Sequence, residues 1–369
     1  MIDRRRLIRS SVGAAALAAV APSLAAARAP AADAALDAAF GEVQPVALAG
    51  GIVARDGLAW SGVRGLRRDG DEVAVTSGDR WHLGSNTKAM TAALWARLVE
   101  QGRARWGMPV SEIFDDVAVD PAWADATLDD FMHHRAGLAD ASVIGPDWLR
   151  TARADPRSLP AQRRAVVEQA LKAPPAGDSG LFQYGNANYI LIGAAIEAVT
   201  GRAWEEVMRT ELFAPLGLSS AGFGPPPGDN AWGHRRSGEA AALPMDPASP
   251  GADNPLALGP AGTAHMTLEE YARFLRVFLR EGDGWLSAET TRRLTTPPPG
   301  GRYAMGWIVL PPQPWARGPA IAHEGSNTMW RATALVDPEG GRAFICLSND
   351  GGRGGPACQA LMRGLIAAA

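Results

Sequence analysis

The stretch Trp81-His82-Leu83-Gly84-Ser85-Asn86-Thr87-Lys88 joins a short strand pattern to the start of a long helix pattern. Residues 86–101 contain no proline or glycine and consist largely of alanine, leucine and other helix formers, and Gly102 is a stop signal just past their end. We therefore predict a strand ending near residue 83 and a helix over 86–101. Ser85 would lie at or near the N-terminus of that helix.

Strand patterns lie towards both ends of the chain, and helix patterns lie between them. A helix is expected at 32–40, and Asp56-Gly57 between the apolar runs 51–54 and 58–60 is a strong hairpin signal. The remaining expected elements are helices at 127–134, 160–172, 187–200, 203–213, 267–281 and 356–367 and strands at 303–310, 319–323, 330–336 and 342–348.

This order of elements predicts an α+β fold. One antiparallel sheet would be built from N- and C-terminal strands and flanked by helices, with a mainly helical subdomain inserted. We assign residues 36–102 and 258–369 to the α/β subdomain and 103–257 to the helical subdomain.

Composition disfavours several functional classes. The formal net charge is −3, and no block rich in lysine or arginine follows the first ten residues, so nucleic acid is not an expected partner. His133 and His134 are adjacent rather than one helical turn apart, and no His-Glu-x-x-His occurs, which disfavours a metal-dependent hydrolase. The absence of Gly-x-Ser-x-Gly disfavours an α/β-hydrolase.

Residues 1–29 have the features of an export signal. A basic segment at 4–9 precedes an uncharged apolar segment at 12–24, and small-residue cleavage sites end at residue 25 or 29. The arginine pair is typical of a twin-arginine signal, with an ordinary secretory signal as the alternative. The apolar segment is shorter than the roughly 20 residues of a membrane helix. We expect a soluble periplasmic or secreted protein without a stable membrane anchor.

The chain has two cysteines, Cys346 and Cys358. A disulfide closing a short loop is open to them in an oxidising compartment. Cys346 lies in the apolar run 343–347, which is typical of a buried strand, so two buried free thiols are the preferred interpretation.

Ser85 and Lys88 form a Ser-x-x-Lys motif. Residues three apart on a helix share a face, so the lysine amine can approach the serine hydroxyl. That hydroxyl is a weak nucleophile until a base takes its proton, and a lysine kept neutral by burial can be the base. The N–H groups at the same helix end can bind an oxyanion. A solvated lysine on the helix surface is the alternative.

The scarcity of lysine in this chain strengthens the Ser-x-x-Lys motif as an indication of catalysis. With 17 serines and only two lysines, Lys88 and Lys172, the spacing arises by chance in about one such chain in ten, so it is weak alone. The chain has 34 arginines, however, and arginine cannot give up its proton in a protein. A lysine retained at position 88 therefore favours an amine base.

Two further groups carry chemistry. Tyr184 and Asn186 lie where a loop meets the helix expected at 187–200; a phenol can relay a proton, and an amide can orient a lysine or a substrate carbonyl. A packed tyrosine beside a helix-capping asparagine is the alternative. In His323-Glu324-Gly325-Ser326, at a predicted strand end, glycine permits close approach of a substrate, and the next N–H can complete an oxyanion site. A structural histidine is the alternative there.

In this order, the three groups resemble the serine β-lactamase and penicillin-binding protein superfamily. The most similar branch contains class C β-lactamases, D-alanyl-D-alanine carboxypeptidases, esterases and D-aminopeptidases. The resemblance covers about residues 45–369 and includes the segments 102–106, 127–138, 260–262 and 271–274. It implies the β-lactamase/transpeptidase-like fold, an active site between the two subdomains, and no metal or cofactor.

The resemblance also implies a role for each group. Ser85 would be acylated, Lys88 would accept its proton, and Tyr184 would act with Lys88 as base and then as acid to the leaving group. Asn186 would hold Lys88 and the substrate, and the N–H groups of Ser85 and Ser326 would form the oxyanion hole.

One departure from the family bears on the substrate. His323 stands where β-lactamases and carboxypeptidases usually have a lysine that binds the substrate carboxylate, and a neutral imidazole does this less well. We therefore expect a serine hydrolase for small ester, amide or peptide substrates, with His323 and Gly325 as positioning residues. β-Lactamase or D,D-carboxypeptidase activity is the alternative, and a non-catalytic relative that binds cell wall or protein is the alternative of another class.

Overall fold

The computed structural model describes residues 24–238 and 240–369. Most of the predicted export signal, residues 1–23, lies outside the described residues. Across the described ranges, no helix combines the length and the apolar character needed to cross a bilayer.

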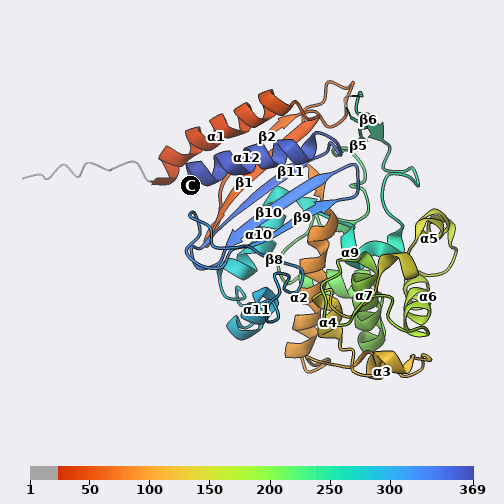
Figure 1. Ribbon diagram of the computed structural model, residues 1–369. Helices are drawn as coiled ribbons and strands as arrows, with labels where there is room; N and C mark the ends of the chain where they lie inside the picture. Colours follow the sequence, from red (N-terminus) through yellow and green to blue (C-terminus); the bar gives the residue numbers. More distant parts are fainter. Residues whose placement is uncertain (1–23, 239) are drawn as a thin grey trace, which may run out of the picture.

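The main sheet has six antiparallel strands in the order β2-β1-β11-β10-β9-β8 (Figure 1). Their bounds are β1 Ala47–Ala54, β2 Gly57–Gly65, β8 Ile308–Val309, β9 Ile321–Ser326, β10 Arg331–Asp337 and β11 Arg342–Ser348. Because β1 pairs with β11, with Ile52 opposite Phe344, both ends of the chain share one sheet, as predicted. The hairpin at Asp56-Gly57 is also confirmed, since Gly57 opens β2 with a φ of 146°.

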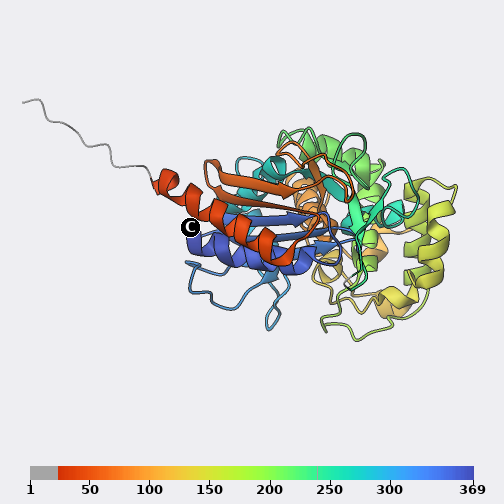
Figure 2. The same ribbon diagram turned by 90° about the horizontal axis from the view of Figure 1, so that it is seen from above.

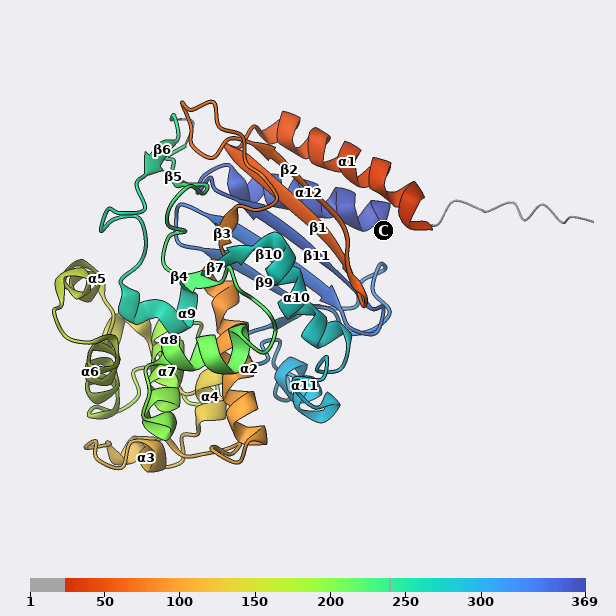
Figure 3. The same cartoon turned by 180° about the vertical axis from the view of Figure 1, so that it is seen from behind.

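Helices cover both faces of this sheet. The helices α1 (Leu24–Val43) and α12 (Gly354–Ala368) lie side by side on one face (Figure 2). The predicted helix at 32–40 lies within α1, where Ala32, Leu36 and Ala39 are buried one turn apart. The helix α10 (Leu268–Leu279) packs against the opposite face (Figure 3).

The remaining helices form a layer beside the sheet, and α2 and α7 lie at its centre in mutual contact (Figure 1). Their bounds are α2 Thr87–Glu100, α3 Val110–Ile113, α4 Leu128–Met132, α5 Pro146–Thr151, α6 Leu159–Leu171, α7 Asn186–Thr200, α8 Trp204–Val207, α9 Gly259–Gly262 and α11 Ala288–Thr295. A π-helical turn, Met208–Phe213, extends α8. The α+β fold is confirmed, whereas the exact division into two subdomains stays a prediction.

One strand prediction needs correction. Residues 303–310 do not form one strand: the backbone N–H of Ala304 donates to the carbonyl of Trp307 in a tight turn that includes Gly306 with φ 83°, which leaves only β8. The strand predicted before Ser85 is confirmed as β3 (Arg80–His82), which lies in a second sheet with β7 (Ala264–Thr267) and β4 (Gly222–Phe223). A two-stranded sheet of Gly233–Arg235 and Leu243–Met245 completes the strands.

Both cysteines are buried free thiols, as preferred from the sequence. Cys346 on β11 and Cys358 on α12 belong to one apolar cluster between the sheet and the helices α1 and α12. Burial raises the pKa of both thiols, which keeps them protonated and unreactive at neutral pH.

Candidate active site

The start of α2 brings Ser85 and Lys88 together. Ser85 lies in the 3-10 turn η1 (Gly84–Asn86), and Lys88 is fully buried in the first turn of α2. Lys88 Nζ lies 3.1 Å from Ser85 Oγ, 2.8 Å from Asn186 Oδ1 and 2.7 Å from the carbonyl oxygen of Ala261. The amine therefore faces the hydroxyl and is held by two oxygens from other parts of the chain.

Asn186 is oriented by an acidic residue that the sequence did not single out. The carboxylate of Asp140 accepts hydrogen bonds from the backbone N–H groups of Asn186, at 3.0 Å, and Ala187, at 2.8 Å. These are the first N–H groups of α7, where a negative charge is favourable. Asp140 thus fixes the end of α7 that presents Asn186 to Lys88. It precedes Asn186 by 46 residues, so no local spacing signals the contact.

Tyr184 lies beside the amine on a mostly aromatic surface. The Tyr184 ring centroid lies 5.0 Å from Lys88 Nζ, and the side chain is 43% exposed. Its ring packs against His134 at 4.6 Å, and His134 also contacts Tyr303 at 4.7 Å. His134 Nδ1 accepts a hydrogen bond from the backbone N–H of Gly185 at 3.4 Å, so this histidine supports the loop that carries Tyr184. No signal in the sequence indicated this role of His134.

His323 is buried and neutral. Its Nδ1 lies 2.8 Å from the carbonyl oxygen of Glu324, which can only accept, so Nδ1 carries the proton. Nε2 then accepts from the hydroxyl of Tyr303 at 3.2 Å. Burial, followed by the nearby charge of Lys88, lowers the pKa of His323 to about 3. The imidazole therefore contributes no positive charge to the site at neutral pH. No signal in the sequence indicated that Tyr303 belongs to the site.

Gly325 and Gly84 allow two backbone segments to touch. A Cβ atom on Gly325 would overlap the carbonyl oxygen of Leu83 and would lie 2.9 Å from the backbone nitrogen of Ser85. Gly84 has a φ of 51°, and a Cβ atom there would overlap the backbone nitrogen of Ser326. The end of β9 therefore lies directly on the turn that carries Ser85, which brings Ser326 to the site. Close approach of backbone, rather than of substrate, accounts for both glycines.

Ser85 opens into two cavities. One has a volume of about 590 Å³, and its lining includes Tyr184, His323, Glu324 and Arg331. The other has a volume of about 200 Å³ and lies on the side of Asp140 and Asn186. Ser326 lines both cavities. A substrate bound across Ser85 can thus place one part on each side of the hydroxyl.

Acidification is expected to destabilise the fold through buried histidines. The pKa of His323 is lowered from 6.5 to about 3 and that of His265 to about 4, in both cases mainly by burial. Between pH 6.5 and these values only the unfolded chain takes up the protons, so the free energy of unfolding falls as the pH falls. We expect a lower thermal midpoint at pH 4.5 than at pH 7.5, measured by circular dichroism.

His265→Asn provides the check on this pH dependence. An asparagine amide can keep the hydrogen bond that His265 Nδ1 donates to the carbonyl of Gly224, but it does not titrate. The difference between the midpoints at the two pH values should shrink in this variant. An unchanged difference would contradict the role of His265.

Several known proteins are similar to this chain in sequence or in fold. Penicillin-binding protein 4 of Amycolatopsis lactamdurans is 27% identical over 78% of this chain and 76% of its own length. The unguisins hydrolase of Aspergillus campestris is 26% identical over 74% of this chain, which spans about half of that protein, 53%. Among solved structures, a D-stereospecific amidohydrolase from Streptomyces has a TM-score of 0.69 at 22% identity, covering 90% of this chain and 97% of its own.

A penicillin-binding protein homologue from Pyrococcus abyssi, described as octameric, has a TM-score of 0.71 at 21% identity, covering 90% of this chain and 76% of its own. The TM-score of the Streptomyces amidohydrolase is similar, and both structures show that this chain shares their fold. The profile of the Beta-lactamase family matches residues 34–369, which is nearly all of the described chain. The chain therefore belongs to the β-lactamase family.

Proposed function

We propose that this protein is a serine hydrolase that cleaves ester or amide bonds through an acyl-enzyme on Ser85. The environment of Lys88 Nζ is the observation that carries the proposal. A neutral amine has two hydrogens and one lone pair. Three oxygens surround Lys88 Nζ: those of Asn186 and Ala261 at 2.8 and 2.7 Å, and Ser85 Oγ at 3.1 Å. Once the amine has lost one proton, the oxygens of Asn186 and Ala261 can hold its two hydrogens, and its lone pair can face the hydroxyl of Ser85.

The reaction would follow in two halves. Lys88 accepts the proton of Ser85 Oγ as that oxygen attacks the substrate carbonyl carbon, and the N–H groups of Ser85 and Ser326 stabilise the oxyanion. The intermediate collapses, the bond to the leaving group breaks, and the alcohol or amine departs with a proton delivered through Tyr184. Water then attacks the acyl-enzyme, releases the acid and restores the Ser85 hydroxyl.

The larger of the two cavities at Ser85 has no net formal charge, which favours substrates that do not need a carboxylate for binding. His323 is neutral, and the formal charges of Glu324 and Arg331, which line the same cavity, offset each other. The Arg331 guanidinium also donates to the carbonyl of Gly351 at 3.2 Å. Small uncharged esters and amides therefore fit this cavity better than β-lactams or peptides with a free C-terminus. Export to the periplasm or the medium remains part of the proposal.

A substrate panel tests the preference. The carboxylate of penicillin would lack the charge-assisted hydrogen bond to a cation, a loss of about 1.5–3 kcal/mol. We therefore expect kcat/KM for p-nitrophenyl butyrate to exceed that for penicillin by about ten- to a hundredfold or more. Glu324→Gln should raise kcat/KM for penicillin severalfold and leave that for the ester unchanged, while Glu42→Gln, an exposed acid on α1, should alter neither. Preferred turnover of penicillin would show instead a β-lactamase, and release of D-alanine from a peptide a D,D-carboxypeptidase. No turnover of any of these would leave the non-catalytic alternative.

A further inference from the structure

A buried histidine lies three residues before Ser85, and both of its ring nitrogens are in use. The backbone N–H of Gly84 donates to His82 Nδ1 at 3.1 Å. Because an amide N–H can only donate, the ring proton lies on Nε2, which donates to Asp253 Oδ2 at 2.8 Å. His82 therefore has no ring nitrogen left for a substrate.

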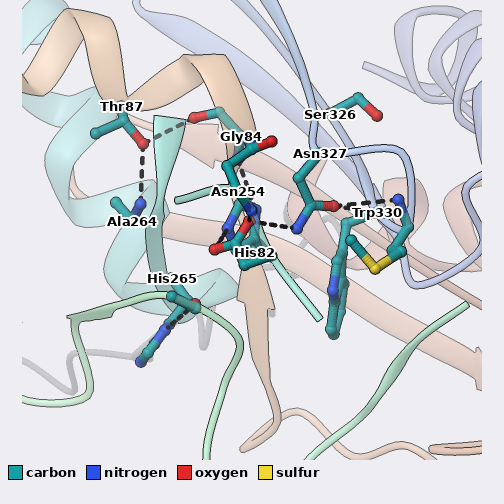
Figure 4. A network of polar contacts seen from close by, with 12 residues as sticks. His82, Gly84, Thr87, Asn254, Ala264, His265, Ser326, Asn327 and Trp330 are labelled. Carbon is teal, nitrogen blue, oxygen red and sulfur yellow. Dashed lines mark hydrogen bonds and ion pairs between the residues drawn. The ribbon is translucent and has the colours of Figure 1, made fainter. Parts of the chain in front are cut away.

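Asp253 continues the network towards the end of β9. Its second oxygen, Oδ1, accepts from Asn327 Nδ2 at 2.8 Å and from the backbone N–H of Asn254 at 2.7 Å. Asn327 Oδ1 accepts from the N–H groups of residues 329 and 330, both at 3.1 Å. Asn327 directly follows Ser326, and Figure 4 shows its side chain reaching towards His82. The network thus links the turn that carries Ser85 to the loop after Ser326.

We propose that His82, Asp253 and Asn327 are positioning residues that hold the N–H groups of Ser85 and Ser326 at the spacing that binds an oxyanion. This inference rests on the proposed function. All three side chains are at most 5% exposed. The hydrogen bonds of Asp253 with His82 and Asn327 join segments far apart in the sequence. The contact of Gly84 with the end of β9 brings the segments together, and the network sets their relative orientation.

Such a role differs measurably from a structural one. An oxyanion exists only in the transition state and in the tetrahedral intermediate, so loss of alignment weakens binding of those species and leaves substrate binding nearly unchanged. A purely structural role would lower stability and the fraction of active protein. It would leave kcat per active site unchanged.

Asp253→Asn breaks the network with little change in shape. In this variant the side-chain amide oxygen at position 253 can still accept from His82, but the amide nitrogen then faces two other donors, Nδ2 of Asn327 and the backbone N–H of Asn254. Adding Asn327→Asp restores the pair between positions 253 and 327, because the new carboxylate accepts both from the amide and from the N–H groups of the turn, while the backbone N–H of Asn254 stays without its acceptor. Asp246→Asn, in an exposed part of the preceding loop, is the matched control. His82→Gln, which keeps a donor for Asp253 and loses the acceptor for Gly84, is a second break.

The experiment measures kcat and KM with p-nitrophenyl butyrate, per active site titrated with a fluorophosphonate, and Ki for an alkyl boronic acid. The tetrahedral boronate on Ser85 places an oxygen where the oxyanion would lie. For Asp253→Asn and His82→Gln we expect kcat to fall about 10- to 100-fold. Ki should rise by a similar factor, and KM should change less than about twofold. The double variant should recover part of the loss, and Asp246→Asn should match the parent.

Unchanged kcat per active site, equal changes in KM and Ki, or no recovery in the double variant would overturn the inference alone, provided that the parent acylates at Ser85. A parent that neither reacts with the fluorophosphonate nor hydrolyses the ester would overturn the proposed function, and the inference with it.

Discussion

Replacing Lys88 with methionine is expected to lower kcat for ester hydrolysis by about a thousandfold, within the range of about 10²–10⁴ that a general base contributes. Methionine fills a similar volume but cannot take the proton of Ser85. It also leaves the oxygens of Asn186 and Ala261 without the N–H donors that they have now. Some loss of stability follows, so kcat is compared per folded protein, with circular dichroism as the check on folding.

The chain provides a matched control, because its only other lysine, Lys172, is exposed at the end of α6. Lys172→Met should leave both kcat and the thermal midpoint unchanged. If Lys88→Met retained more than about a tenth of the parent kcat, Lys88 would not be the base.

Gly325→Ala is expected to impair both the fold and the reaction. The added Cβ atom would overlap the carbonyl oxygen of Leu83, a backbone atom that cannot rotate away, so β9 and the Ser85 turn must separate. Overpacking of this kind costs about 1–3 kcal/mol of stability, and a shift of about 1 Å in a reacting group costs about a hundredfold in kcat.

Gly41→Ala on α1 is the control for Gly325→Ala, because a Cβ atom there meets nothing within 4 Å. Urea unfolding and kcat, measured on both variants, check the prediction. Parent-like kcat and stability in Gly325→Ala would show that β9 does not lie against the Ser85 turn as described.

Elements whose formation depends on residues close together in the sequence were predicted correctly. The run of helix formers from residue 86 and the stop at Gly102 placed α2 to within a residue, and Asp56-Gly57 placed the first hairpin. Ser85 and Lys88 are neighbours because helical geometry puts them there. The pattern misled at residues 303–310, where apolar residues line a tight turn around Gly306 instead of a strand.

The supporting residues of the site could not be predicted in the same way. Asp140 reaches Asn186, Tyr303 reaches His323, and Asp253 reaches His82 only after distant segments pack together. None of these contacts can be recognised in the sequence from a characteristic spacing between the two residues. Tyr184 at a loop-helix junction and His323 at a strand end were candidates from the sequence, and the resemblance to a family assigned their roles. Their neighbours in the site became apparent only from the tertiary structure.

The most direct measurement is mass spectrometry of the protein after treatment with a fluorophosphonate, followed by peptide mapping. A Ser85 nucleophile activated by Lys88 predicts one adduct, on the peptide that contains Ser85, and its absence in Ser85→Ala and marked slowing in Lys88→Met. An adduct on any other serine, or equal labelling of the parent and Ser85→Ala, would contradict the assignment of Ser85 as the nucleophile.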